Sequence, residues 1–73
     1  MKLSKEGLDL IAWSSIRTRR DQLINETDWT QISDAPLSDD KKAEFAVYRQ
    51  KLRDLPQLHK EPDLVIWPKK PTL

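Results

Sequence analysis

The sequence has 73 residues and contains no cysteine, one glycine and one histidine. Without cysteine there are no disulfide bonds and no thiolate metal sites, and a single glycine cannot build a glycine-rich loop around a phosphate group. Lys and Arg number 13 and Asp and Glu 12, for a formal net charge of +1. The excess of basic residues that drives binding to nucleic acid is therefore missing.

Long apolar runs are also absent. No run approaches the roughly 18 residues that a membrane-spanning helix needs, and residues 1–7 lead into neither a long apolar segment nor a cleavage site of the kind a signal peptide has. We expect a soluble, intracellular protein with a single small helical domain over residues 1–73. A chain this short buries only about 60% of the surface that it exposes when unfolded, which leaves little room for a shielded catalytic pocket.

The first predicted helix covers about residues 4–26, with Ser4 as its N-cap. Its apolar residues fall into two stripes. The first stripe is Leu8, Ile11, Ala12, Ile16 and Leu23, and the second is Leu3, Leu10, Trp13 and Ile24, mixed with Arg17 and Arg20. Because one stripe suffices to pack on one partner helix, the second predicts either a protein interface or a surface that the chain's own C-terminal residues Leu64, Val65 and Ile66 cover.

A loop is predicted over residues 27–37, where turn-forming residues interrupt the helical period. The second predicted helix covers about residues 38–55, because Ser38 is a suitable cap and proline disfavours helical geometry in the residue before it. Its apolar stripe is Phe45, Tyr48, Leu52 and Leu55, and its charged residues, Arg49 and Arg53 among them, are expected on a solvated outer face.

The tail over residues 56–73 contains a short apolar piece, residues 64–67, between Pro62 and Pro68. This composition predicts an edge strand or an extended strip lying on the helices. The expected fold class is all-α, a helix–loop–helix hairpin with a C-terminal extended strip packed on it. Trp29 and Trp67 are expected in the core, where they would close the loop and the tail over the hairpin.

No residue is assigned to catalysis, to a cofactor or to a metal ion. His59 is the only histidine and lies in a polar segment. We therefore expect it on the surface, without a base or nucleophile beside it. Asp39, Asp40 and Glu44 lack the glycine-containing loop of a cation site and are typical of a helix start. We expect a protein that is not an enzyme and needs no cofactor.

Five segments of the chain carry a recognisable pattern. They are RTRRDQLI (17–24), ETDW (26–29), DAPLS (34–38), YRQKLRDLP (48–56) and PDLVIWPKKP (62–71). In this order and at these spacings, they closely resemble the phage tail assembly chaperone family. The segments over residues 48–56 and 62–71 are also similar to the C-terminal part of phage tail fibre assembly proteins. The resemblance implies a helper protein of tail or tail fibre morphogenesis that acts in the host bacterial cytoplasm.

The function expected from these observations is to bind and shield a phage tail or tail fibre protein during virion assembly. A chaperone needs an exposed apolar surface rimmed by charge. The candidate protein-binding residues are Leu10, Trp13, Arg17, Arg20, Ile24, Val65 and Trp67.

Other functions stay open at this point. A small phage protein of this kind could bind and inhibit or redirect a host or defence protein, or remain in the finished tail as a minor structural component. Contact of the arginines with nucleic acid is a more distant alternative. A homodimer would give the second apolar stripe a partner.

Overall fold

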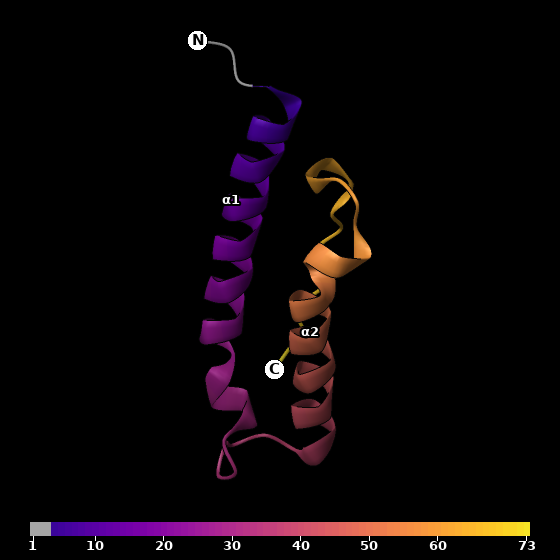
Figure 1. Ribbon diagram of the computed structural model, residues 1–73. Coiled ribbons are helices and arrows are strands. Elements are labelled where there is room, and N and C mark those ends of the chain that lie inside the picture. The colour runs from indigo at the N-terminus through magenta and orange to yellow at the C-terminus, as the bar shows by residue number, and fades with distance from the viewer. Residues whose placement is uncertain (1–3) are drawn as a thin grey trace.

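The computed structural model describes residues 4–73, except for the side chains of Lys5 and Glu6, so the place predicted for Leu3 lies outside it. The elements are helix α1 (Lys5–Glu26), the short 3-10 helix η1 (Asp28–Gln31), helix α2 (Asp39–Leu58) and the 3-10 helix η2 (Pro62–Leu64). Figure 1 shows α1 and α2 side by side and antiparallel, joined at one end by η1 and the loop after it. The predicted all-α hairpin is confirmed, and residues 4–73 contain no strand.

Both helices begin at the serine that the sequence predicts. The Ser4 hydroxyl accepts a hydrogen bond from the Gly7 N–H at 3.1 Å, and the Ser38 hydroxyl accepts one from the Lys41 N–H at 3.2 Å. Each bond satisfies one of the backbone donors that a helix leaves free in its first turn. Asp39 and Asp40 follow in the first turn of α2, where negative charge complements the helix dipole.

The apolar core is small and comes from α2. Its buried side chains are Phe45, Tyr48, Leu52 and Leu55, and the half-buried Leu23, Ile24, Leu37 and Val65 pack against them. The single stripe predicted for the second helix is therefore the core of the molecule. Burying a leucine or phenylalanine side chain contributes about 1.5–3 kcal/mol, so this short row provides much of the stability.

Helix α1 has one packing face rather than two apolar stripes. Its half-buried residues include Ala12, Trp13, Ile16, Arg20, Leu23 and Ile24, which take members from both predicted stripes. The outer members face solvent: Leu8, Ile11 and Leu10 are 54%, 54% and 69% exposed. The prediction of a separate second stripe was wrong because a charged residue, Arg20, lies in the middle of the packing face and divides its apolar residues into two groups.

Helix α2 continues past the predicted end. It extends to Leu58 and includes Pro56 in its last turn. Proline lacks the N–H that would bond the Leu52 carbonyl, and its ring crowds that carbonyl. A 3.0 Å contact between His59 Nδ1 and the Leu55 carbonyl oxygen supports the turn after Pro56. The helix therefore tolerates Pro56 near its C-terminus, where few backbone bonds are lost.

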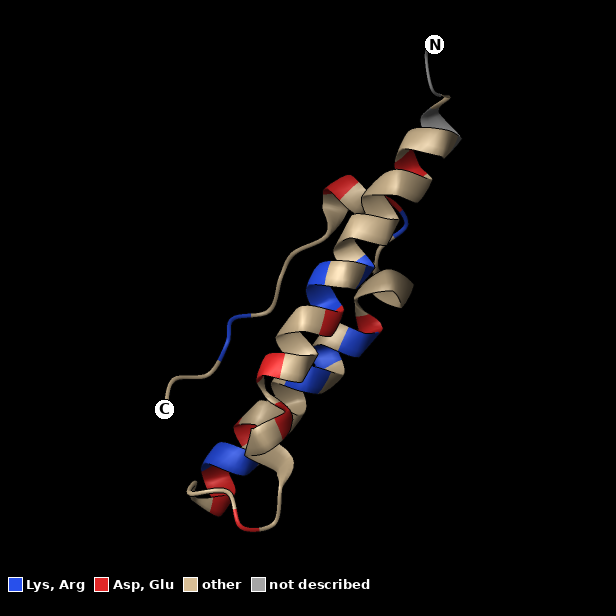
Figure 2. Cartoon of the chain, turned by 90° about the vertical axis from the view of Figure 1, so that its left-hand side faces the viewer, with Lys and Arg blue, Asp and Glu red and all other residues tan. Residues whose placement is uncertain are grey.

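The tail lies on one side of the hairpin. In Figure 1 it passes behind α2, and Figure 2, turned by 90°, shows it along that same side. Val65 packs against the core, whereas Ile66 is 79% exposed and Trp67 is 38% exposed. Trp29 is also 38% exposed, so the expectation that Trp29 and Trp67 are core residues was wrong. Pro68 and Pro71 of the tail are also half-buried.

The molecule is a thin rod of 52 × 18 × 17 Å. Its radius of gyration is 15.1 Å, against about 11 Å for a compact domain of this length. The chain exposes 5529 Å² of surface, whereas a compact monomer of its mass exposes about 4700 Å². The difference is close to the roughly 800 Å² that each partner buries in a standard protein interface.

Candidate protein-binding surface

The polar contacts between the helices concentrate at the closed end of the hairpin, the end that carries η1. Arg49 of α2 is 8% exposed, and its Nη1 donates to the Ile24 carbonyl oxygen at 2.6 Å and to Thr27 Oγ1 at 3.0 Å. Its Nη2 pairs with Asp28 Oδ1 at 2.8 Å. Arg49 therefore joins α2 to the C-terminus of α1 and to η1.

Two buried threonines complete this polar cluster. Thr27 and Thr30 are 1% and 0% exposed. The Thr27 hydroxyl contacts the Leu23 and Ile24 carbonyl oxygens, both at 3.0 Å, and the Thr30 hydroxyl donates to the Thr27 carbonyl oxygen at 2.6 Å. Among residues 4–73, no buried side-chain polar atom lacks a hydrogen-bond partner. The cluster therefore joins α1, η1 and α2 at the closed end of the hairpin.

The line of contact between α1 and α2, called the seam below, has two sides, and the tail lies on one of them. Tyr48 is buried next to this tail side of the seam and is 4% exposed. Burial raises the pKa of the Tyr48 hydroxyl, the negative charge of Glu26 raises this pKa further, and the positive charge of Arg19 lowers it. The balance favours the neutral phenol.

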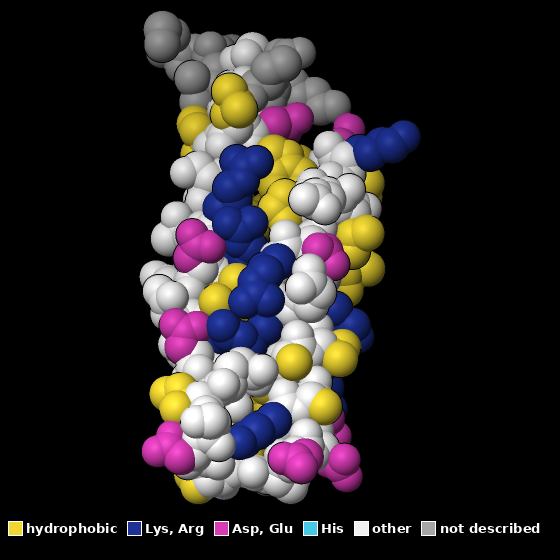
Figure 3. Space-filling view, turned by 60° about the horizontal axis from the view of Figure 1, so that its bottom comes forward, with side chains coloured by type: hydrophobic (Ala, Val, Ile, Leu, Met, Phe, Trp, Pro, Cys, Tyr) yellow, Lys and Arg dark blue, Asp and Glu magenta, His cyan; other side chains and the backbone are white. Residues whose placement is uncertain are grey.

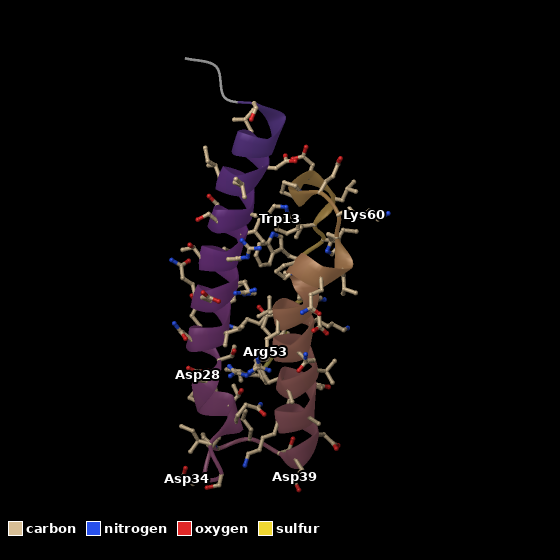
Figure 4. The ribbon with its side chains drawn as sticks, in the orientation of Figure 1. Trp13, Asp28, Asp34, Asp39, Arg53 and Lys60 are labelled. Atoms are coloured by element: carbon tan, nitrogen blue, oxygen red, sulfur yellow. The ribbon has the colours of Figure 1, made fainter. Side chains whose placement is uncertain are left out.

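The opposite side, called the open side of the seam, carries basic residues. Figure 3 shows Lys and Arg side chains following one another between the two helices, with acidic side chains on the flanks. Arg49 pairs with Asp28 on this side and contacts Ile24. Arg53 follows Arg49 by one helical turn, and Arg17 precedes Ile24 by two turns, so Arg53 and Arg17 lie on this side too. In Figure 4, Trp13 and Arg53 lie in the region between the helices.

Ion pairing leaves much of this basic row available. Arg17 and Arg53 are exposed, and within the described residues neither has an ion-pair partner. Arg20 is half-buried and pairs with Asp21 at 3.1 Å, a carboxylate whose side chain is 61% exposed. Such an exposed pair contributes less than about 1 kcal/mol, so the Arg20 guanidinium can readily exchange Asp21 for another carboxylate.

Exposed apolar residues gather at the open end of the hairpin, opposite η1. Leu10 and Ile11 lie in the first half of α1, and η2 packs beside that half of the helix (Figure 1). Leu64 at the end of η2 is 57% exposed, and Ile66 just after it is 79% exposed. This group, called the open-end patch below, consists of Leu8, Leu10, Ile11, Leu64 and Ile66. It surrounds the end of the rod rather than forming a single face, because Leu8 and Leu10 are about 160° apart around α1.

The residues predicted to bind a protein partner fall into different environments. Leu10 and Trp67 are exposed, Trp13 and Arg20 are half-buried on the α1 packing face, and Arg17 is exposed. Ile24 and Val65 pack on the core. Leu10 therefore belongs to the open-end patch, whereas Arg17, Arg20 and Trp13 lie along the seam. Sequence reasoning missed Arg53, because Arg49, one helical turn before it, was expected in solvent and not between the helices.

A comparison with protein families gives one match. The family model described as phage tail assembly chaperone protein matches residues 13–72, which is most of the chain. The chain belongs to this family. The resemblance inferred from the sequence is thus confirmed. No curated protein and no solved structure matches the chain.

The part shared with the phage tail assembly chaperone family contains the open side of the seam and the tail. Trp13, Arg17, Arg20 and Arg53 lie within the matched range, whereas Leu10 precedes it. No helix among residues 4–73 is apolar enough over a sufficient length to cross a membrane. The same part of the chain contains no group of side chains suited to hold a metal ion and no pocket.

Proposed function

We propose that this protein binds a phage tail or tail fibre protein in the host bacterial cytoplasm and covers apolar surface on it until the tail assembles. The family membership supports a role in tail assembly and a protein partner. The observation that carries the proposal is the open-end patch, because its five apolar side chains are more than half exposed at one end of a thin rod.

The physical reason is the cost of exposed apolar area. Covering apolar surface contributes about 25 cal/mol per Å², and contiguous apolar patches larger than a few hundred Å² mark interaction sites. A partner that covers the open-end patch gains this contribution without unfolding either helix. Assembly releases the partner when a stronger interface in the tail replaces it.

The experiment is co-expression of the chain with each tail and tail fibre protein of its phage, followed by measurement of the soluble fraction and of complex formation. We expect one of these proteins to become soluble in complex with the chain. Leu10→Asp with Ile11→Asp should abolish the complex, because two charges would enter the apolar contact.

Val47→Asp is the matched control. Val47 is 55% exposed, against 54% for Ile11, but it lies on the outer face of α2 away from the open end. This variant should hold the tail protein as well as the unchanged chain does. Equal loss in both variants, or no tail protein captured at all, would refute the proposal. A chaperone should also be missing from purified virions analysed by mass spectrometry.

A further inference from the structure

The open side of the seam is a second surface, and it differs from the open-end patch in chemistry. The tail occupies only the opposite side of the two helices (Figures 1 and 2). On the open side the basic row is visible from outside along the rod (Figure 3). A third helix can pack along the line where two adjacent helices meet, because a helix packs about 8–10 Å from each of its neighbours.

We propose that this side binds an acidic, amphipathic helical segment of the tail protein as a third helix, an inference that rests on the proposed function. The carboxylates of the segment pair with Arg17, Arg20 and Arg53, and its apolar residues contact Trp13. Guanidinium groups bind carboxylates through two parallel hydrogen bonds, and Trp and Arg are the residues that most often dominate interface energies.

Charge decides the chemistry of the partner. Arg17 and Arg53 have no ion-pair partner within residues 4–73, and the partner of Arg20 is an exposed carboxylate. Neighbouring cations repel one another, so a ligand that brings negative charge between them is favoured. The spacing also fits a helix, because Arg17 and Arg20 are three residues apart on α1, about 4.5 Å along the axis.

Nucleic acid fits this surface less well than an acidic helix does. Acidic side chains flank the basic row on both sides (Figure 3), and the net charge of the chain is only +1. A phosphate backbone is negative along its whole length and would meet these acidic flanks, whereas an amphipathic helix presents one acidic stripe. The seam is therefore assigned to a protein ligand.

The test uses two synthetic helical peptides as probes, alike in length and apolar positions, one with Glu and the other with Gln on the polar face. Titration of the isotope-labelled full chain should show that the Glu peptide binds at least tenfold more tightly than the Gln peptide. The amide and side-chain signals of Trp13, Arg17 and Arg53 should shift most. Binding should weaken as salt increases.

Arg17→Glu with Arg53→Glu should reduce the affinity for the Glu peptide at least tenfold. Lys69→Glu with Lys70→Glu changes the net charge equally but lies in the exposed tail, and it should leave the affinity within about twofold. Circular dichroism should show that both variants keep their helices, since all four side chains are exposed.

The inference would be overturned by equal binding of the Gln peptide, by equal loss in the tail variant, or by a single-stranded DNA oligonucleotide that displaces the Glu peptide. Its failure is distinct from failure of the proposed function. If the arginine variant still captures the tail protein, the seam is not the binding surface but the chaperone role stands. If the peptide binds as expected and no tail protein is captured, the proposed function is wrong.

Discussion

Replacement of Arg49 by alanine should destabilise the hairpin more than replacement of any other charged residue of α2. The guanidinium makes three contacts, with the Ile24 carbonyl, the Thr27 hydroxyl and the Asp28 carboxylate. Hydrogen bonds of a charged donor contribute about 1.5–3 kcal/mol each when one partner is removed. The sum of the three would be an overestimate.

Two of the three acceptors still have a hydrogen-bond partner in the variant. The Ile24 carbonyl still accepts from the Thr27 N–H at 3.0 Å, and the Asp28 side chain is 58% exposed and returns to water. We therefore expect Arg49→Ala to lower the free energy of unfolding by about 2–3 kcal/mol. A domain of this length has about 4–11 kcal/mol in total, and the melting temperature should fall by about 10–20 °C.

Urea unfolding followed by circular dichroism at 222 nm measures this change. Arg53→Ala is the control, because Arg53 lies one turn further along the same side of α2, is exposed and lacks an ion-pair partner among the described residues. It should change the free energy of unfolding by less than about 0.5 kcal/mol. Equal midpoints for the two variants would show that the Arg49 contacts do not hold the closed end.

Two further predictions concern the core. Leu52→Ala should lower the free energy of unfolding by about 2–5 kcal/mol, because the Leu52 side chain is 0% exposed. Leu58 lies on the same helix and is 70% exposed, so Leu58→Ala should change the free energy of unfolding by less than about 0.5 kcal/mol. Similar urea midpoints for the two variants would contradict the assigned core. The raised pKa of Tyr48 means that the folded state holds its phenol proton more tightly than the unfolded state, whose pKa is 10.0. Stability should therefore fall as the pH increases above 10, and Tyr48→Phe should reduce this fall in urea titrations at pH 9–11; an identical fall in the variant would refute the assignment.

The sequence predicted the structure best where a single local feature, a helix cap or a helical period, decided the outcome. Ser4 and Ser38 precede regular helical patterns, and both cap helices as predicted. The apolar residues of α2 recur at spacings of three and four, so helical period located the core residues Phe45 and Leu52, although the buried Arg49 lies between them. The hairpin follows from these local preferences together with the connecting loop.

The sequence was least informative where a charged residue packs between helices. Arg49 was expected in solvent, but the carbonyls and hydroxyls that it contacts come from residues more than twenty positions earlier in the chain. Arg20 likewise divided one packing face into two apparent stripes. Long side chains bury their stems while their charged ends find partners, and those partners are visible only once the helices are placed.

The arrangement of the inter-helix contacts makes the two ends of the hairpin unequal. At the closed end, Arg49 holds α1 and α2 through three polar contacts, and the Lys42 ammonium adds a 3.0 Å bond to the Ser33 carbonyl. Beyond Arg49, no hydrogen bond joins α1 and α2 among the described residues, and the buried side chains there are apolar, Leu52 and Leu55. We therefore expect amide hydrogens at the closed end to exchange with solvent more slowly than those at the open end.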